Sequence, residues 1–145
     1  MSDYLNGIIE GFYGKTWSWS ARRAAIDFLA QEQFNTYVYA PKADRQLRRE
    51  WREPHEPAEF AELMALRAHC REKNIGFGIG FSPWGLQSRY KIWDRMALTQ
   101  TFVKLNALRF DVLCILFDDM PGHIDGLAQR QADIVFDILA ATSAK

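Results

Sequence analysis

Two adjacent aspartates, Asp118 and Asp119, directly follow the apolar run VLCILF at 112–117 of this chain. A run that is apolar at every position is typical of a parallel strand that other layers cover on both faces. Two carboxyl groups in a half-dry site do not ionise equally, because proximity and burial raise one of the two pKa values. One group can then donate a proton while its partner remains an anion, a division of roles that suits glycoside cleavage.

Other polar residues end earlier apolar runs. Glu10 and Gly11 close the run GIIEG, and Lys42 follows TYVYA. The loops that follow parallel strands emerge at one edge of the sheet, where the reactive groups of α/β folds gather. We therefore expect the lysine, the glutamate, the glycine and the two aspartates to lie at one edge. Consecutive residues of a strand point in opposite directions, so the two aspartates need not touch each other.

Each of these residues also has a structural interpretation. An Asp pair after a strand is often a turn or a helix cap, and the Pro-Gly dipeptide at 121–122 predicts a turn here. Glu10 can be a strand-end charge that pairs with a neighbouring lysine, and Lys42 can be a solvated side chain. The aspartates with His123 and Asp125 can form an oxygen-rich metal site, but their spacing matches no standard calcium loop.

The surrounding pattern alternates strands with helices four times. Apolar runs at 7–11, 36–40, 75–82 and 112–117 predict four strands. The third run alternates glycine with Phe or Ile, which gives a strand with one bare face and predicts close approach by another group. This order predicts an α/β domain with a parallel sheet of four βα units. No GxGxxG motif follows the first strand, so a dinucleotide-binding fold has no support.

Four helices are predicted between and after these strands. Ser20 is placed to cap the first helix. The second helix is predicted from Pro57 to Lys73, with proline in its first turn, and the third from about Ile92 to Leu108. Apolar residues at helical spacing define the first and last helices: Ala21, Ala24, Ala25, Phe28 and Leu29 in the first, and Ala128, Ala132, Val135 and Leu139 in the last.

Composition narrows the class of protein. The chain has 145 residues, which predicts one domain (1–145), and its 18 basic residues balance 18 acidic ones. A zero net charge argues against a nucleic-acid partner, and the basic cluster at 44–53 is interleaved with acids, as in a solvated loop. Two cysteines form no disulfide framework and are predicted to be reduced and buried. No signal peptide or membrane span is predicted, so we expect a cytoplasmic protein without a membrane partner.

Four sequence blocks, in their order and spacing, resemble glycoside hydrolase family 84. They are GIIEGFYGKTWS (7–18), NTYVYAPKAD (35–44), REWREP (49–54) and CILFDDMPG (114–122). This family contains the protein O-GlcNAcases and related β-N-acetylglucosaminidases, some of them described as hyaluronidases. The resemblance extends over about residues 7–139.

The resemblance implies a retaining β-N-acetylglucosaminidase that uses substrate-assisted catalysis on a TIM barrel. The 2-acetamido oxygen of the substrate would attack the anomeric carbon and form an oxazoline. Asp118 would orient the acetamido N–H, and Asp119 would be the general acid and then the base. Gly11 and Lys42 would contact sugar hydroxyls. The resemblance implies no metal and no cofactor, and the substrate would be a glycan or glycoprotein that carries β-linked N-acetylglucosamine.

The sequence departs from the family pattern in two motifs and in length. APKAD places Ala43 where the family commonly has an acid, and SPWGLQ (82–87) replaces the common SPGLD with Trp84 and Gln87 in that loop. The four βα units correspond to half of a TIM (β/α)8 barrel, which needs eight units and about 250 residues. The family's other sugar-binding side chains would come from the absent half.

Two functions are therefore open. The chain can be a glycosidase that is inactive alone or depends on a partner, or a non-catalytic carbohydrate- or protein-binding half-barrel remnant. Three arrangements are also open: a truncated or split gene product, a homodimer or pairing with a second half-barrel, and a rearranged doubly wound sheet. An uncovered parallel edge exposes unpaired backbone groups, which favours pairing with another chain.

Overall fold

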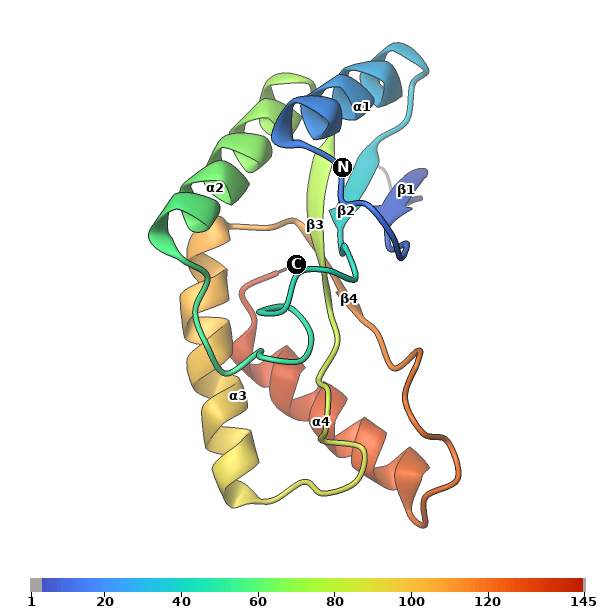
Figure 1. Ribbon diagram of the computed structural model, residues 1–145, viewed down its shortest axis with the longest axis vertical. Coiled ribbons are helices and arrows are strands. Elements are labelled where there is room, and N and C mark those ends of the chain that lie inside the picture. Colours follow the sequence, from blue (N-terminus) through green and yellow to red (C-terminus); the bar gives the residue numbers. More distant parts are fainter. Residues whose placement is uncertain (1–3, 145) are drawn as a thin grey trace.

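The computed structural model describes residues 4–144, in which four parallel strands alternate with four α-helices (Figure 1). The strands lie in the sheet in chain order, β1–β2–β3–β4. The predicted fold class is confirmed: this is an α/β fold consistent with half of a TIM barrel, and its sheet is open. The elements are β1 (Gly7–Glu10), α1 (Trp19–Gln31), β2 (Thr36–Tyr39), α2 (Pro57–Glu72), β3 (Gly76–Phe81), α3 (Ile92–Leu105) with a 3-10 turn (Asn106–Leu108), β4 (Val112–Ile115) and α4 (Leu127–Ala141).

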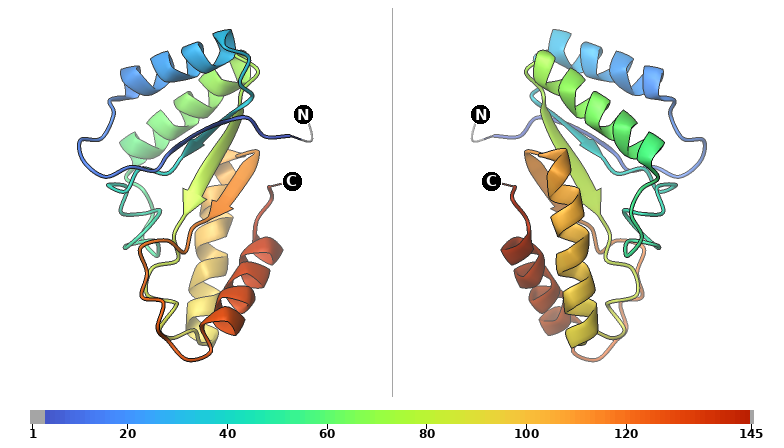
Figure 2. Two further views of the ribbon diagram at one scale, coloured as in Figure 1. Left: turned by 90° about the vertical axis from the view of Figure 1, so that its right-hand side faces the viewer. Right: turned by 90° about the vertical axis from the view of Figure 1, so that its left-hand side faces the viewer.

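The helices pack on one side of the sheet. Figure 2 shows α2 and α3 in front of the strands in one view and behind them in the opposite view. A doubly wound sheet reverses its strand order part-way and places helices on both faces. The strand order here does not reverse, so the doubly wound rearrangement, one of the three arrangements that the sequence left open, is excluded.

The strand register determines which side chains form the core. Ile8, Tyr37 and Phe77 lie in one row across β1, β2 and β3, on the face that the helices cover. On the opposite face, Ile9 is 53% exposed and Cys114 is only partly buried. The prediction that the fourth strand is covered on both faces is therefore wrong, because the described residues supply only one covering layer. Cys114 and the buried Cys70 are free thiols.

The glycines of β3 are required by close packing on that open face. A Cβ atom at Gly80 would lie 2.4 Å from Cβ of Ala40 and 2.9 Å from Cδ1 of Leu116. A Cβ atom at Gly78 would lie 2.9 Å from Cγ2 of Val38. The predicted close approach is confirmed, and the approaching groups are side chains of the neighbouring strand and of the segment that continues β4.

The helix predictions hold in position but differ in detail. Ser18, two residues before the predicted Ser20, is the N-cap of α1, and its Oγ accepts a hydrogen bond from the Ala21 backbone N–H at 3.1 Å. In α4 the core residues are Ile134 and Ile138. The predicted apolar stripe of α4 is only partly covered: Ala132 and Val135 are half-buried, whereas Ala128 and Leu139 are exposed, Leu139 at 57%.

Glu10 does not face the site edge. Its carboxylate is buried on the helix side of the sheet, where Nε and Nη2 of Arg22 donate hydrogen bonds to it at 2.9 Å and the Tyr37 hydroxyl donates another. The Arg22 guanidinium also lies 4.4 Å from the ring centroid of Trp19. The expectation that Glu10 joins the lysine and the aspartates is wrong: as the last residue of β1 it points, like Ile8, toward the helices.

We expect Glu10→Gln to destabilise the chain by about 3–5 kcal/mol, because it leaves the Arg22 charge buried without its counter-ion. The matched control is Glu62→Gln, which breaks a half-exposed pair with Arg23 and is expected to cost less than about 1 kcal/mol. Urea unfolding followed by circular dichroism measures both. Equal costs for the two variants would contradict the structural role assigned to Glu10.

Candidate active site

The loop between β2 and α2 (residues 40–56) carries Lys42 and is fixed by buried hydrogen bonds. Asp44 accepts a hydrogen bond from the Leu47 backbone N–H at 2.9 Å and pairs with Nε2 of His55 at 3.0 Å. Trp51 is fully buried and donates from Nε1 to the Trp84 carbonyl at 3.0 Å. The interpretation of residues 44–53 as a solvated loop therefore holds only in part. Arg45, Arg49 and Arg52 are exposed, whereas Asp44, Leu47, Arg48 and Trp51 pack into the fold.

The two aspartates lie in a turn beyond the last strand. β4 ends at Ile115, two residues before the end of the predicted strand, so the alternation of strand side chains does not reach Asp118 and Asp119. Asp119 has φ = 59°, a left-handed conformation that is uncommon outside glycine and that Asp tolerates better than most residues. A turn is present, as predicted, but at Asp118 and Asp119 and not at the Pro-Gly dipeptide, and both carboxylates contact the same neighbour.

That neighbour is Lys42. Its ammonium group donates to Oδ2 of Asp118 and lies 2.9 Å from Oδ2 of Asp119. The lysine side chain is only 8% exposed, whereas Asp118 is 50% and Asp119 is 38% exposed. One buried cation thus joins the loop after β2 to the turn after β4, across the end of β3.

Two residues that the sequence did not single out as site residues complete this cluster. The Tyr13 hydroxyl donates to Oδ2 of Asp119 at 2.7 Å, and Nη2 of Arg48 donates to the Tyr13 oxygen at 2.9 Å. Nη2 of Arg48 also lies 3.7 Å from Oδ2 of Asp119. Arg48 belongs to the basic cluster at 44–53, and nothing in the sequence indicates a contact between Tyr13 and Asp119, which lie 106 residues apart.

Gly11 occupies the same loop as Tyr13. It directly follows β1, and its backbone N–H donates to the Ile9 carbonyl at 2.9 Å. The glycine therefore begins the loop that reaches Asp119, but the structure gives it no contact with Lys42 or with either carboxylate. Of the predicted set, Lys42 and the two aspartates form one cluster, Gly11 borders it through its loop, and Glu10 lies in the core.

The surroundings of Asp119 and Lys42 stabilise the charged form of each side chain. Hydrogen bonds from Lys42 and Tyr13 lower the pKa of Asp119, and the positive charge of Arg48 acts in the same direction. Burial opposes the charge on Lys42, but the hydrogen bonds and charges of the two aspartates outweigh it and raise the pKa of the lysine. The direction for Asp119 is opposite to the one expected of a general acid, because the group is solvated and has a cation beside it.

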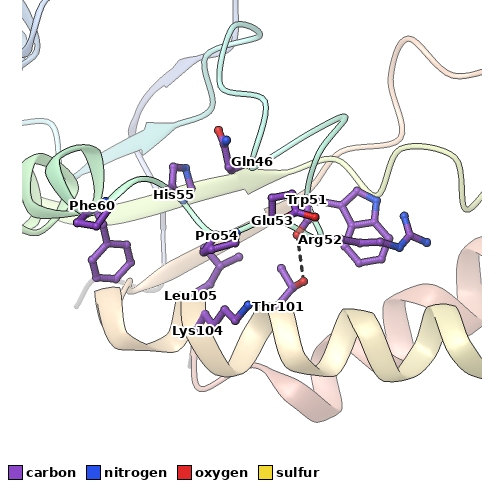
Figure 3. A pocket seen from close by; sticks show the side chains of 11 residues that line it. Gln46, Trp51, Arg52, Glu53, Pro54, His55, Phe60, Thr101, Lys104 and Leu105 are labelled. Atoms are coloured by element: carbon purple, nitrogen blue, oxygen red, sulfur yellow. Dashed lines mark hydrogen bonds between the residues drawn. The ribbon is translucent and has the colours of Figure 1, made fainter.

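The cluster is an open surface, and a separate pocket lies elsewhere in the fold. This pocket of about 250 Å³ lies between the loop at 40–56 and α3. Figure 3 shows Pro54 and His55 of the loop on one side of it and Thr101 and Lys104 of α3 on the other. The pocket contains none of the predicted site residues. Among residues 4–144, no three His, Cys, Asp or Glu side chains are grouped so that they could hold a metal ion. In the same range, no helix is long and apolar enough to cross a membrane.

Comparison with known proteins identifies the family. Residues 6–145 match the family model described as beta-N-acetylglucosaminidase. The chain belongs to this family, glycoside hydrolase family 84. It is also similar to two curated relatives named "Protein O-GlcNAcase", from Rattus norvegicus and from Mus musculus, each 40% identical over 122 residues. These matches cover 83% of this chain and 13% of each relative, so the chain spans a small part of their length.

The two departures from the family-84 motifs lie beside the cluster. Ala43 follows Lys42 directly, and its position is exposed, so the missing acid leaves no buried charge unpaired. Trp84 stacks with the guanidinium of Arg48 at 4.7 Å and with that of Arg49 at 5.1 Å. The altered loop of this β-N-acetylglucosaminidase family member therefore contacts the side chain that holds Tyr13.

We expect His55 to make stability depend on pH. Burial opposes its charge, but Asp44 outweighs burial and raises the pKa of His55 above its ordinary value of about 6.5. The stabilisation is then complete below about pH 6.5 and is lost as the pH rises through the folded-state pKa. Urea midpoints of the native chain and His55→Asn, measured from about pH 5.5 to about pH 8.5, should converge as the pH rises. Midpoints that fall in parallel would contradict the buried Asp44–His55 ion pair.

Proposed function

We propose that this chain carries the acid pair of a retaining β-N-acetylglucosaminidase and hydrolyses β-linked N-acetylglucosamine once its barrel is completed. The observation that carries the proposal is the contact of Lys42 with both Asp118 and Asp119 at the edge where the βα loops emerge. Membership of family 84 supports the same reaction. The named relatives support a protein that bears O-linked N-acetylglucosamine as the substrate.

In the proposed first step, Asp119 donates its proton to the glycosidic oxygen, and the bond from that oxygen to C1 breaks. The substrate's 2-acetamido oxygen forms a bond to C1 and gives an oxazoline, while Asp118 holds the acetamido N–H. In the second step the Asp119 carboxylate takes a proton from water, and the resulting hydroxyl attacks C1. The acetamide re-forms, and the configuration at C1 is retained because it inverts twice.

This assignment requires the electrostatics of the cluster to change when sugar binds. In the structure Lys42 and Tyr13 stabilise the charged form of Asp119, whereas the first step needs its protonated form. If the Lys42 ammonium moves to sugar hydroxyls, as the family resemblance implies, Asp119 loses its strongest partner. Exclusion of water by the sugar and by surrounding loops then raises the pKa of a carboxyl group further.

Completion of the sheet is part of the proposal. Strands β1 and β4 form the two edges of the sheet in the described residues, and Ile9 and Leu139 are apolar side chains left exposed on the open face and on α4. Four further βα units would pair both edges and enclose the acid pair. We propose that further chain of a longer protein, a second half-barrel or a second copy supplies them.

The alternative is a non-catalytic carbohydrate- or protein-binding half-barrel. The exposure of the two aspartates favours it, because solvent screens the electrostatic stabilisation on which glycoside cleavage depends. The lowered pKa of Asp119 favours it too, since the chain alone holds the carboxylate in its anionic state.

We expect the purified chain, at concentrations at which a second copy completes the barrel, to release aglycone from aryl β-N-acetylglucosaminides, and Asp119→Asn to lower kcat by about 10²–10⁴-fold. Because a general acid matters most for a poor leaving group, the loss should be greater for a phenyl than for a 4-nitrophenyl glycoside. Glu62→Gln, which breaks the half-exposed α1–α2 pair with Arg23 and no contact of the cluster, is the matched control and should leave both rates unchanged.

Turnover measured at several protein concentrations distinguishes the glycosidase from the non-catalytic binding alternative. Activity per molecule that rises with concentration, together with dimers in light scattering, would support completion by a second copy. No turnover at any concentration, with sugar still bound in a titration followed by NMR, would contradict catalysis by this chain and establish the binding alternative.

A further inference from the structure

Arg48 is a buried cation at the edge of the acid cluster. Its side chain is 8% exposed, and its guanidinium lies 4.7 Å from the ring centroid of Trp84 and 5.6 Å from that of Tyr13. An arginine held between two aromatic rings has little rotational freedom, and its planar fork of donors is fixed in direction. The hydrogen bond to the Tyr13 oxygen at 2.9 Å lies along one of those directions.

The contacts of Arg48 continue to the carboxylate of Asp119. Tyr13 itself is exposed and lies in the loop after β1, so its ring has no packing layer to hold it in place. Its hydroxyl can accept from Arg48 and donate to Oδ2 of Asp119 at the same time, as the two distances of 2.9 and 2.7 Å require. The guanidinium thereby gives this exposed donor a buried partner.

We propose that Arg48 is a positioning residue of this site: clamped by Trp84, it holds the Tyr13 hydroxyl against Asp119 and so fixes the orientation of that carboxylate. The importance of this orientation for catalysis rests on the proposed glycosidase function, whereas the contact itself does not. Arg48 acts through Tyr13, since its nearest nitrogen lies 3.7 Å from Asp119 and no closer.

The clamp explains the altered loop of this chain. Trp84 belongs to the SPWGLQ segment, and its backbone is held by the Trp51 indole N–H at 3.0 Å. This hydrogen bond attaches the backbone of Trp84 to the β2–α2 loop. The Trp84 ring then covers the guanidinium of Arg48, which belongs to the same loop. A smaller residue at position 84 would uncover Arg48 to water and loosen the relay to Asp119.

Three groups favour the charged form of Asp119: Lys42, Arg48 and the Tyr13 hydroxyl. Asp118 shares the Lys42 ammonium with it. Lys42 contacts both carboxylates, so it cannot orient one of them independently of the other. The Arg48–Tyr13 relay contacts Asp119 alone. It therefore distinguishes the two members of an otherwise similar pair, which a reaction with two different carboxylate roles requires.

The test measures Asp119 directly, without substrate. Carboxyl ¹³C NMR titrations of the full chain follow the Asp119 pKa in the native sequence, Arg48→Gln and Arg48→Lys. The matched control is Arg49→Gln, which removes a guanidinium that also lies over Trp84 but makes no contact with Asp119. We expect Arg48→Gln to raise the Asp119 pKa, Arg48→Lys to restore part of the native value, and Arg49→Gln to leave it unchanged.

Tyr13→Phe is a second variant in case Arg48→Gln unfolds. It removes only the hydroxyl of an exposed ring, so we expect it to fold. It should raise the Asp119 pKa by itself, and adding Arg48→Lys to Tyr13→Phe should then produce little further change. A titration of Asp119 that is the same in Tyr13→Phe and the native chain would overturn the proposal.

A kinetic arm separates this inference from the proposed function. If the chain or its completed form cleaves aryl β-N-acetylglucosaminides, Arg48→Gln should lower kcat about 10- to 100-fold with little change in KM. It should also move the alkaline limb of the pH profile to higher pH. If the native chain is inactive but Arg48→Gln still changes the Asp119 pKa, the proposed glycosidase function is contradicted and the positioning role of Arg48 is retained.

Discussion

A single ammonium group, that of Lys42, is buried between the carboxylates of Asp118 and Asp119, and the rest of the site is arranged around it. Burying an ammonium without a counter-charge costs several kcal/mol, and two neighbouring carboxylates repel each other unless a cation lies between them. Here the two carboxylates supply the counter-charge of the buried ammonium, and the ammonium reduces the repulsion between the carboxylates. The contact also passes over the end of β3, because Lys42 follows β2 and the aspartates follow β4. It therefore joins two loops that belong to non-adjacent strands.

The same contact stabilises the anion of Asp119, whereas the first step of the proposed glycosidase reaction needs its neutral acid. A cation beside Asp119 favours its anion, which is the form that can activate water, whereas protonation of the leaving oxygen needs the neutral acid. In an enclosed barrel the sugar can engage the ammonium and exclude water at the same moment, which shifts the balance toward the neutral acid. In the open half-barrel the balance stays with the anion. Enclosure, rather than the presence of the residues, is therefore what distinguishes an active site from a binding surface in this chain.

Sequence reasoning could predict the order of elements and the lysine–aspartate cluster, because both follow from rules that act along the chain. Apolar runs set β1 to β4 to within about two residues, and the loops after parallel strands share an edge. It could not predict which way Glu10 points, since one residue of register decides between core and edge. Nor could it find Arg48: a basic residue among acids looks solvated until the Tyr13 and Trp84 rings that cover it are placed. These contacts join segments far apart in sequence, and no local pattern records them.

The most direct test of this account is NMR of the Lys42 side-chain ammonium in the intact chain. Scalar couplings across hydrogen bonds connect a lysine Nζ to the carbon of the carboxylate whose oxygen accepts the hydrogen bond, so they report which carboxylates are bound. The account predicts correlations from Lys42 to the carboxyl carbons of both Asp118 and Asp119. A slowly exchanging ammonium that couples to only one of them, or a rapidly exchanging one that couples to neither, would contradict the bridge on which the site depends.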